Sequence, residues 1–507
     1  MIPLTIAEIA EIVGGRLDNV ANPQAKVIGT VEFDSRQISP GSLFLALPGA
    51  KVDGHDFAEK AHAAGAVVTL AARPVGTPAI IVPSQAKAEA GSQAYVFAHD
   101  EDGSVRALLT ALAKLARAVV TRLTSRWGLS VVGVTGSAGK TSTKDMVAAL
   151  LSTAGPTVAP PGSFNNEIGH PYTALRCHED TQFLVTELSA RGLGHIAQLA
   201  EIAPPQIGAV LNVGTAHLGE FGSKDTIAQA KGELIEAVPE ASAGGVAVLN
   251  ADDPAVVQMA TRTQGKIVTF SANGDTQADY YATDVRLDEL ARASFLLHSP
   301  EAQPVQIRLQ VAGKHQIANA LAAAAVAAAA GVPVETIGTT LCDYVAVSAH
   351  RMDIRQRGAN VTIINDAYNA NPESMRAGLA ALAASAGTTT QLEDTQLEDS
   401  GQAIAVLGEM SELGTDAVAA HRELGTQLAA YGVDTLVAVG KTDNIAALTE
   451  GAQEAGVGTH HVADVTGATR TVEEILGSAQ RRVVVLVKAS NAWRLWRVAE
   501  QLVNSEL

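Results

Sequence analysis

The stretch GVTGSAGKT, residues 133–141, joins a short apolar run to a segment of helical character that extends to residue 151. A glycine-rich turn between a strand and a helix lets successive backbone N–H groups face an anion, and the helix N-terminus adds its positive dipole end. Lys140 would then reach the outer phosphates of a nucleotide, and the Thr141 hydroxyl would bind Mg²⁺. The alternative is a glycine-rich turn with a chance Lys-Thr pair. Because strand, turn and helix occur in the required order, the stretch predicts an ATP site.

The spacing of this loop departs by one residue from the strict phosphate-loop pattern. That pattern requires glycine at position 134, where this chain has valine, and Gly133 stands one residue early. The match is therefore to the variant TGSxGKT. The loop residues predicted to bind ATP are Gly136, Ser137, Ala138, Gly139, Lys140, Thr141 and Ser142.

The length and composition of the chain limit the classes of protein to which it can belong. The 507 residues are enough for about three domains of ~150 residues each. A net charge of −17 argues against a nucleic-acid partner, because binding a phosphate backbone requires a basic face. With Cys177 and Cys342 as the only cysteines, no disulfide framework is expected. The N-terminus lacks the basic start of a signal peptide, and the most apolar run, 318–330, is too short to span a bilayer. We expect a soluble, intracellular protein without membrane insertion.

Short apolar strands alternate with helical segments along the chain, and this rhythm predicts an α/β fold of three domains, 1–105, 106–347 and 348–507. The central domain is expected to hold a parallel, mononucleotide-binding sheet of the P-loop type, flanked by a meander. The third domain is expected to be a Rossmann-like, doubly wound sheet. The predicted strands are 27–31, 43–46, 67–70 and 79–82; then 130–134, 183–187, 207–212, 246–250 and 267–270; then the meander at 280–285, 294–298 and 306–310; and last 361–365, 404–407, 435–439 and 483–487.

A polar segment, 385–403, contains the direct repeat TQLED-TQLED at 390–399. Its low hydrophobicity predicts a solvated loop insertion without a catalytic part.

Three further residues have candidate roles in chemistry. Glu187 ends an apolar strand, and a carboxylate at the C-terminal end of a parallel strand points into the crevice where ligands bind, so it can hold Mg²⁺. A helix-capping acid is the alternative. His217 follows another strand end and is explained equally well as a ligand or as a hydrogen-bonded loop residue. Lys231 lies in a helical stretch and by itself indicates only a solvated lysine.

The order of these motifs resembles the Mur ligase family, cytoplasmic ATP-dependent enzymes that extend the peptidoglycan stem peptide. TGSAGKT is similar to the family's ATP loop, and GKHQIANALAAAA, 313–325, to its adenine-side motif. In that motif His315 and Asn319 match, whereas Gln316 stands where the family usually has asparagine. The resemblance implies that Thr141, Glu187 and His217 hold magnesium. It also implies that Lys231 is carbamylated and supports a second Mg²⁺.

The flanking regions resemble the same family. The segment 34–57 is similar to its UDP-sugar-binding domain, which implies UDP contacts from Ser35 and Arg36. AHRM, 349–352, is similar to the inter-domain junction whose arginine, here Arg351, reaches the ATP phosphates. SFNNEIGHPYTAL (163–175), NDAYNANPESM (365–375) and LGEMSELG (407–414) resemble the dipeptide-adding member of the family.

The same resemblance assigns roles in the third domain. Asp366 is implied to contact the nucleotide, and Asn369 and Asn371 to line the dipeptide side. In VKASNAW, 487–493, Lys488 and Ser490 match the family pattern, and the residues at 489 and 491 depart from it.

The resemblance implies an ADP-forming ligase of peptidoglycan synthesis with ATP and Mg²⁺ as cofactors, expected to act as a monomer. It would join D-alanyl-D-alanine to the tripeptide carboxylate of UDP-N-acetylmuramoyl-tripeptide through an acyl phosphate. The implied catalytic residues are Lys140, His217, Lys231 and Arg351. A sister ligase that adds one amino acid and a folylpolyglutamate synthetase-like ligase are alternatives with the same chemistry. A nucleotide-dependent switch without ligase activity is the alternative from another class.

Overall fold

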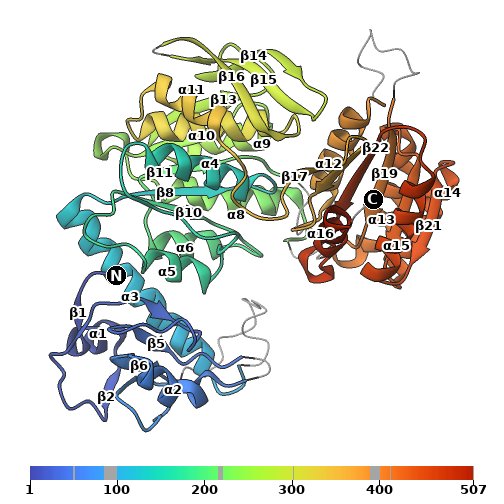
Figure 1. The fold of residues 1–507 in the computed structure, drawn as a ribbon. Coiled ribbons are helices and arrows are strands. Elements are labelled where there is room, and N and C mark those ends of the chain that lie inside the picture. Colours follow the sequence, from blue (N-terminus) through green and yellow to red (C-terminus); the bar gives the residue numbers. More distant parts are fainter. Residues whose placement is uncertain are drawn as a thin grey trace.

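The computed structural model describes residues 1–49, 52–84, 100–214, 221–300, 302–388, 400–411 and 413–505. They form an N-terminal part (blue in Figure 1), a central part (cyan to yellow) and a C-terminal part (orange to red). His217 and the TQLED repeat of the expected insertion lie outside the described residues.

The N-terminal part contains a five-stranded sheet of order β2-β7-β6-β5-β4, with β1 and β3 paired beside it. The strand predicted at 27–31 is wrong. Both Ile28 and Gly29 direct their N–H groups at the Gly41 carbonyl, so the chain turns there and the run divides into β3 and β4. The elements are β1 (Leu4–Thr5), α1 (Ile6–Val13), β2 (Arg16–Asp18), β3 (Lys26–Val27), β4 (Val31–Glu32), β5 (Leu43–Leu45), α2 (Ala58–Ala63), β6 (Val68–Ala71) and β7 (Ala79–Ile81).

Helix α3 (Ser104–Trp127) connects the N-terminal and central parts. Its apolar face lies in one core that also contains side chains of the N-terminal sheet and of the central part. At 24 residues it is the longest helix described, yet no helix in the described ranges is long and apolar enough to cross a membrane.

The central part is built on a nine-stranded sheet of order β16-β15-β14-β13-β12-β11-β8-β10-β9. The strands from β9 to β14 are parallel, and β15 and β16 continue the sheet antiparallel. The meander therefore extends the sheet, whereas we expected it to flank the domain. The strands are β8 (Ser130–Thr135), β9 (Thr157–Val158), β10 (Phe183–Glu187), β11 (Ile207–Val210), β12 (Val246–Asn250), β13 (Lys266–Ser271), β14 (Tyr280–Leu287), β15 (Arg292–Ser299) and β16 (Ala302–Ala312).

Helices cover both faces of this sheet (Figure 1). On one face, the alanine-rich α10 packs against α4, and α11 lies beside them. The alanine side chains of α10 are buried along most of the helix. A helix that is apolar nearly all round is expected to be buried in this way. The helices are α4 (Lys140–Ser152), α10 (Gln316–Ala329) and α11 (Val334–Asp343) on this face, and α5 (Gly169–Ala174), α6 (His195–Ile202) and α8 (Lys224–Glu236) on the other.

The C-terminal part is a six-stranded sheet of order β17-β18-β22-β19-β20-β21, parallel except at β17. Helices α12, α13 and α14 pack on one face and α15 and α16 on the other, as a doubly wound sheet requires. The sequence patterns did not predict β17 and β21, because both are edge strands with mainly polar residues. The elements are β17 (Asp353–Arg357), β18 (Val361–Asn365), α12 (Pro372–Ala386), β19 (Gln402–Leu407), α13 (Ala417–Gln427), β20 (Thr435–Val439), α14 (Asp443–Glu454), β21 (Gly458–Val462), α15 (Val465–Ser478), β22 (Val483–Lys488) and α16 (Trp496–Asn504).

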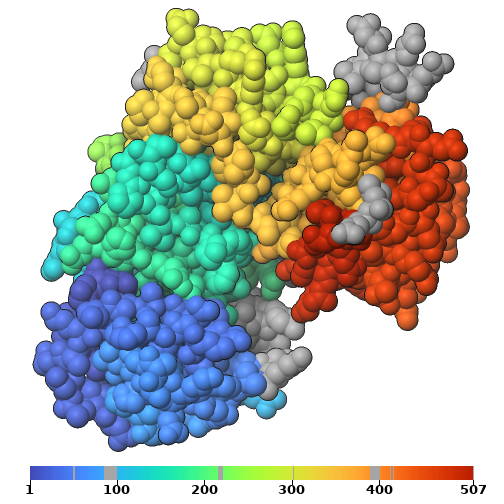
Figure 2. All heavy atoms as spheres, viewed as in Figure 1, coloured from blue at the N-terminus to red at the C-terminus, as the bar shows by residue number. Residues whose placement is uncertain are grey.

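A linker from residue 344 to 352 joins the central and C-terminal parts, which meet along it in Figure 2. Ser348 donates a hydrogen bond of 2.6 Å to Asp145 on α4. Two non-glycine residues in the linker have left-handed backbones, His350 at φ 60° and Met352 at φ 50°. Such conformations are costly for side chains with a Cβ atom, and here the ring of His350 stacks on Trp496 at 4.8 Å. The junction is thus held by contacts to both parts.

Gly425 allows α13 and α14 to pack backbone to backbone. A Cβ atom there would lie 2.3 Å from the Leu448 carbonyl oxygen, so Gly425→Ala should cost about 1–3 kcal/mol of unfolding free energy. Gly477 in α15 is the matched control, because nothing lies within 4 Å of its added Cβ. Gly477→Ala should be neutral or stabilising by about 1 kcal/mol. Urea unfolding monitored by circular dichroism measures both, and equal stabilities would contradict this packing.

Candidate active site

A cavity of about 520 Å³ opens between the central and C-terminal parts, where the parallel strands of both sheets end. Ligands of open α/β sheets bind at such carboxyl ends. The residues that line it include Ser137, Ala138, Gly139, Lys140, Thr141, Ser142, Ser163, Asn165, Glu187, Arg191, His195, Asn212, His315, Gln316, Asn319, Arg351, Asp366, Tyr368, Asn369, Asn371, Glu373, Lys488 and Asn491.

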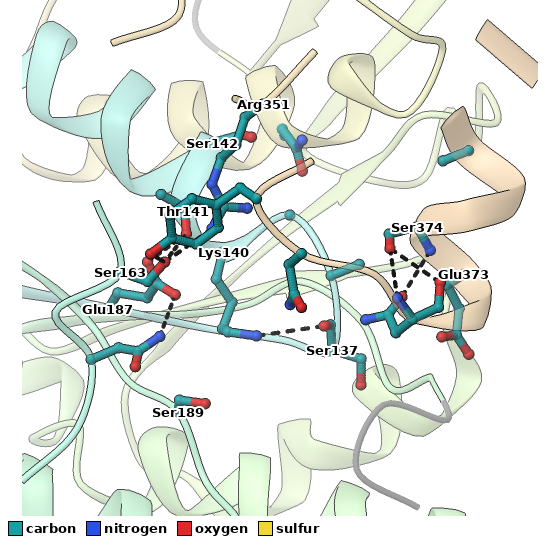
Figure 3. Close-up of a pocket in the computed structure, with 18 of the residues that line it drawn as sticks. Ser137, Lys140, Thr141, Ser142, Ser163, Glu187, Ser189, Arg351, Glu373 and Ser374 are labelled. Atoms are coloured by element: carbon teal, nitrogen blue, oxygen red, sulfur yellow. Dashed lines mark hydrogen bonds between the residues drawn. The ribbon is translucent and has the colours of Figure 1, made fainter. Parts of the chain in front are cut away.

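The phosphate loop lies between β8 and α4, as the sequence predicts. Gly139 has φ 82°, and a Cβ atom there would lie 2.4 Å from the Asn319 carboxamide oxygen. Glycine is therefore required both by the left-handed turn and by the close approach of α10. Lys140 begins α4, and its Nζ donates to the Gly136 carbonyl at 2.8 Å. It also lies 3.5 Å from the Ser137 carbonyl oxygen, to which it donates (Figure 3). The helix N-terminus and this ammonium supply positive charge at one end of the cavity.

A carboxylate lies directly beside the loop. The Thr141 hydroxyl donates to Glu187 Oε2 at 2.8 Å, and Asn165 donates to Oε1 at 2.7 Å (Figure 3). The Glu187 side chain is buried. A hydroxyl and a carboxylate next to a phosphate loop are hard oxygen donors, which fit Mg²⁺ with its few protein ligands and its phosphate and water oxygens. Among the residues that the structure describes, no group of three or more His, Cys, Asp or Glu side chains could hold a metal ion.

Arg351 brings a cation from the linker to Ser163, which lies beside Thr141. Its Nη2 donates to the Ser163 hydroxyl at 2.9 Å, and its guanidinium lies 4.2 Å from the centre of the Tyr368 ring. Ser163 in turn donates to the Tyr368 hydroxyl at 3.1 Å and lies 3.4 Å from Thr141. Residues of the central part, the linker and the C-terminal part are therefore joined in one network.

The C-terminal part contributes a second charged group. Lys488 is buried and donates to the carboxylate of Asp366 and, at 2.9 Å, to the Asn369 carbonyl. Asn371 caps α12 by accepting from the Ser374 N–H at 2.8 Å. His315 faces this group from the central part. Burial lowers the pKa of its imidazole, which Asp366 partly opposes, so the ring is neutral at pH 7.

Lys231 is placed unexpectedly: it is 5% exposed on α8, although its sequence context indicated a solvated lysine. No hydrogen bond or ion pair joins its amine to another described residue. Burial, and then the nearby charge of Lys140, lowers the pKa of the Lys231 amine well below its ordinary value. A neutral amine is a nucleophile, whereas an ammonium is not. The amine does not line the cavity.

Most residues predicted to bind ATP or the dipeptide line the cavity. The residues predicted to bind UDP do not. Ser35 and Arg36 lie in the N-terminal part, where Asp34 holds Arg36 at 2.7 Å. Ser490 is buried away from the cavity and accepts from the Ser411 N–H at 2.8 Å. No role had been predicted for Ser163, Asn165, Asn212 or Tyr368. Three of them fall within segments singled out by resemblance, whereas Asn212 carries no signal except its place at the end of a predicted strand.

Models of three Mur ligase domains match the chain: the catalytic domain of the Mur ligase family at residues 27–119, the Mur ligase middle domain at 134–327, and the Mur ligase glutamate ligase domain at 350–491. The UDP-N-acetylmuramoyl-tripeptide–D-alanyl-D-alanine ligase of Mycobacterium tuberculosis is 52% identical, covering 100% of this chain and 99% of its own. The crystal structure of MurF from Acinetobacter baumannii has TM-score 0.81 and 28% identity over 99% of both chains. MurF from Thermotoga maritima in complex with ADP has TM-score 0.73 and 26% identity, covering 94% of this chain and 97% of that one.

The burial of Lys231 predicts a stability cost. A lysine whose folded pKa is lowered binds fewer protons when folded than when unfolded, so stability falls as pH drops below the ordinary pKa of 10.5. In buffer free of CO₂, nucleotide and divalent cations, Lys231→Met should be more stable than the wild type at pH 7 by about 1–3 kcal/mol, the cost of one buried polar group. The gain should shrink as the pH approaches 10.5. Thermal unfolding across pH measures it, and a less stable variant at pH 7 would refute the burial argument.

Proposed function

The chain belongs to the Mur ligase family, and we propose that it joins D-alanyl-D-alanine to the tripeptide carboxylate of UDP-N-acetylmuramoyl-tripeptide, forming ADP and phosphate. The observation that carries this proposal is the single cavity in which a phosphate loop, Glu187 and Arg351 meet side chains of the C-terminal part. Full-length identity to a ligase with these substrates supports the choice of substrates. The segments 365–375 and 407–414 support the dipeptide over a single amino acid, because both resemble the dipeptide-adding member.

A carboxylate cannot acylate an amine at neutral pH, because its leaving group would be oxide. In the proposed reaction the tripeptide carboxylate attacks the γ-phosphorus of ATP, ADP leaves, and an acyl phosphate forms. The amine of the dipeptide then attacks the acyl carbon, loses a proton, and expels phosphate. Phosphoryl transfer needs mainly positioning and neutralisation of charge. Lys140 from the phosphate loop and Arg351 from the linker both line the cavity and supply positive charge. Glu187 with Thr141 would hold Mg²⁺, which neutralises phosphate oxygens when bound.

We further propose a division of labour between the parts. Residues 1–105 bind the UDP moiety through Ser35 and Arg36. Residues 106–347 bind ATP, with His315 and Asn319 on the adenine side. Residues 348–507 bind the dipeptide. The acyl phosphate hydrolyses in water, so a cavity formed between parts that can close protects it.

Finer assignments complete the proposal. Asp366 contacts the nucleotide, and Asn369 and Asn371 line the dipeptide side. His217 and a carbamate on Lys231 would complete the magnesium sites. We propose that the enzyme works as a monomer in the cytoplasm and serves cell-wall synthesis during growth and division.

Product formation tests the function directly. Wild-type enzyme with ATP and the UDP-linked tripeptide should form ADP and the UDP-linked pentapeptide only when D-alanyl-D-alanine is added. Lys140→Ala should lower turnover by roughly 10²–10⁴-fold, because it removes a charge that clamps the phosphates. Mass spectrometry of the UDP product and an ADP assay measure both. Equal product formation with a single amino acid would favour the sister ligase. A variant that keeps a tenth of the turnover would refute the phosphate-loop role.

Carbamylation of Lys231 generates a separate prediction. The neutral buried amine attacks the carbon of CO₂ and loses a proton, which leaves a carbamate whose two oxygens can bind metal. Lys231→Ala should therefore be nearly inactive and should recover partly in formate or acetate, which replace the missing carboxylate. Lys231→Arg should be inactive and not rescued, because arginine keeps its charge. Turnover is measured with added formate and, as a control, with equal chloride. Full activity of an enzyme whose intact mass shows unmodified Lys231 would overturn the assignment.

A further inference from the structure

Asn212 holds the phosphate loop by its side chain. Its carboxamide oxygen accepts two hydrogen bonds of 2.9 Å, from the backbone N–H groups of Ser137 and Ala138. Its amide nitrogen donates to the Ala138 carbonyl at 3.1 Å. The side chain thus makes three hydrogen bonds to two consecutive loop residues, and it lines the cavity. The resemblance to the Mur ligase family assigns no role to this residue.

The segment that carries Asn212 lies between the loop and the C-terminal part. Two further hydrogen bonds join the segment to the loop: the Gly214 N–H donates to the Ser137 hydroxyl at 2.8 Å, and the Ser137 N–H also donates to the Asn212 backbone carbonyl at 3.1 Å. On its other side Gly214 is close to α12, because a Cβ atom there would lie 2.9 Å from Glu373 Oε1. This segment therefore supports the loop on the side that faces the C-terminal part.

Two successive N–H groups that point at one oxygen form a concave arrangement of the kind that binds anions. A carboxamide oxygen carries only a partial negative charge, so it orients these groups without the full charge of a competing anion. The donated bond to the Ala138 carbonyl fixes which end of the carboxamide faces the N–H groups. Aspartate has the same shape but lacks this donor and carries a full negative charge.

We propose that Asn212 is a positioning residue for ATP: it fixes the first half of the phosphate loop in the conformation that receives the phosphates. This inference rests on the proposed function, because it assumes that the loop binds ATP. The carboxamide acts through the loop backbone, so its loss should weaken nucleotide binding and spare the sites of the other two substrates.

The test compares Asn212→Ala and Asn212→Asp with the control Asn250→Ala. Asn250 is buried and donates to the Leu211 carbonyl at 2.8 Å, so it supports the same segment without a hydrogen bond to the loop. For each variant we would measure KM for all three substrates, kcat, the Kd of ADP by calorimetry, and Tm.

Asn212→Ala should raise KM for ATP and the Kd of ADP about tenfold, because it removes the hydrogen bonds from the carboxamide to the loop. Its KM values for the UDP-linked peptide and the dipeptide should stay within about twofold, and kcat within about threefold. Asn212→Asp should be worse for ATP because of charge repulsion, and its excess loss should shrink at high salt. Asn250→Ala should lower Tm and leave the KM for ATP unchanged.

Two results would overturn the proposal. One is an unchanged KM for ATP and Kd of ADP in Asn212→Ala. The other is an equal rise of all three KM values together with a Tm loss that matches Asn250→Ala, which would assign Asn212 a structural role only. Failure of the proposed function is distinguishable, because the wild type would then not bind ADP or would form no peptide product in the same assays.

Discussion

The parallel ladder of β10, β8 and β11 is the constraint on which the site depends. Glu187 pairs with Val134 and Val210 pairs with Thr135, so the three strands end together at one edge of the sheet. Parallel strands require crossover connections, and each connection begins at that edge. The phosphate loop, the Glu187 carboxylate and the segment after Val210 therefore lie side by side, although they are far apart in sequence. Hydrogen bonds of the ladder fix the strand ends, and the hydrogen bond from Thr141 to Glu187 is one consequence.

Apolar patterns predicted the buried strands well. The strands at 183–187, 246–250, 361–365 and 435–439 have the predicted limits. Such strands are buried on both faces, so they are nearly continuous apolar runs whose limits can be recognised in the sequence. Polar edge strands such as β17 lack that signal. Patterns also could not show that β11 ends at Val210, because the next two residues turn to hydrogen-bond with the loop strand and the loop.

The sequence predicted those site residues whose roles follow from a short motif or from the end of a strand. Lys140 and Thr141 follow from the loop, and Glu187 from its place at a strand end. Lys231 was not predictable from residue pattern, because its burial depends on the packing of α8 against the rest of the central part. Asn212 is a similar case, since the loop residues it contacts are 74 and 75 positions away in sequence. A side chain that acts through backbone atoms far away in sequence forms no short motif, so a sequence pattern does not indicate it.

The left-handed backbones of His350 and Met352 bear on how long the parts stay together. Residues held in such conformations store about 1–3 kcal/mol each while the surrounding structure holds them. Arg351 lies between them, and its guanidinium donates to Ser163, so the strained backbone and the contact with the central part belong to the same three residues. The free energy stored in these two residues therefore opposes the contacts that hold the two parts together, and any motion that relaxes them recovers it. An enzyme that shelters an intermediate and then releases three products requires contacts between its parts that form readily and also break readily.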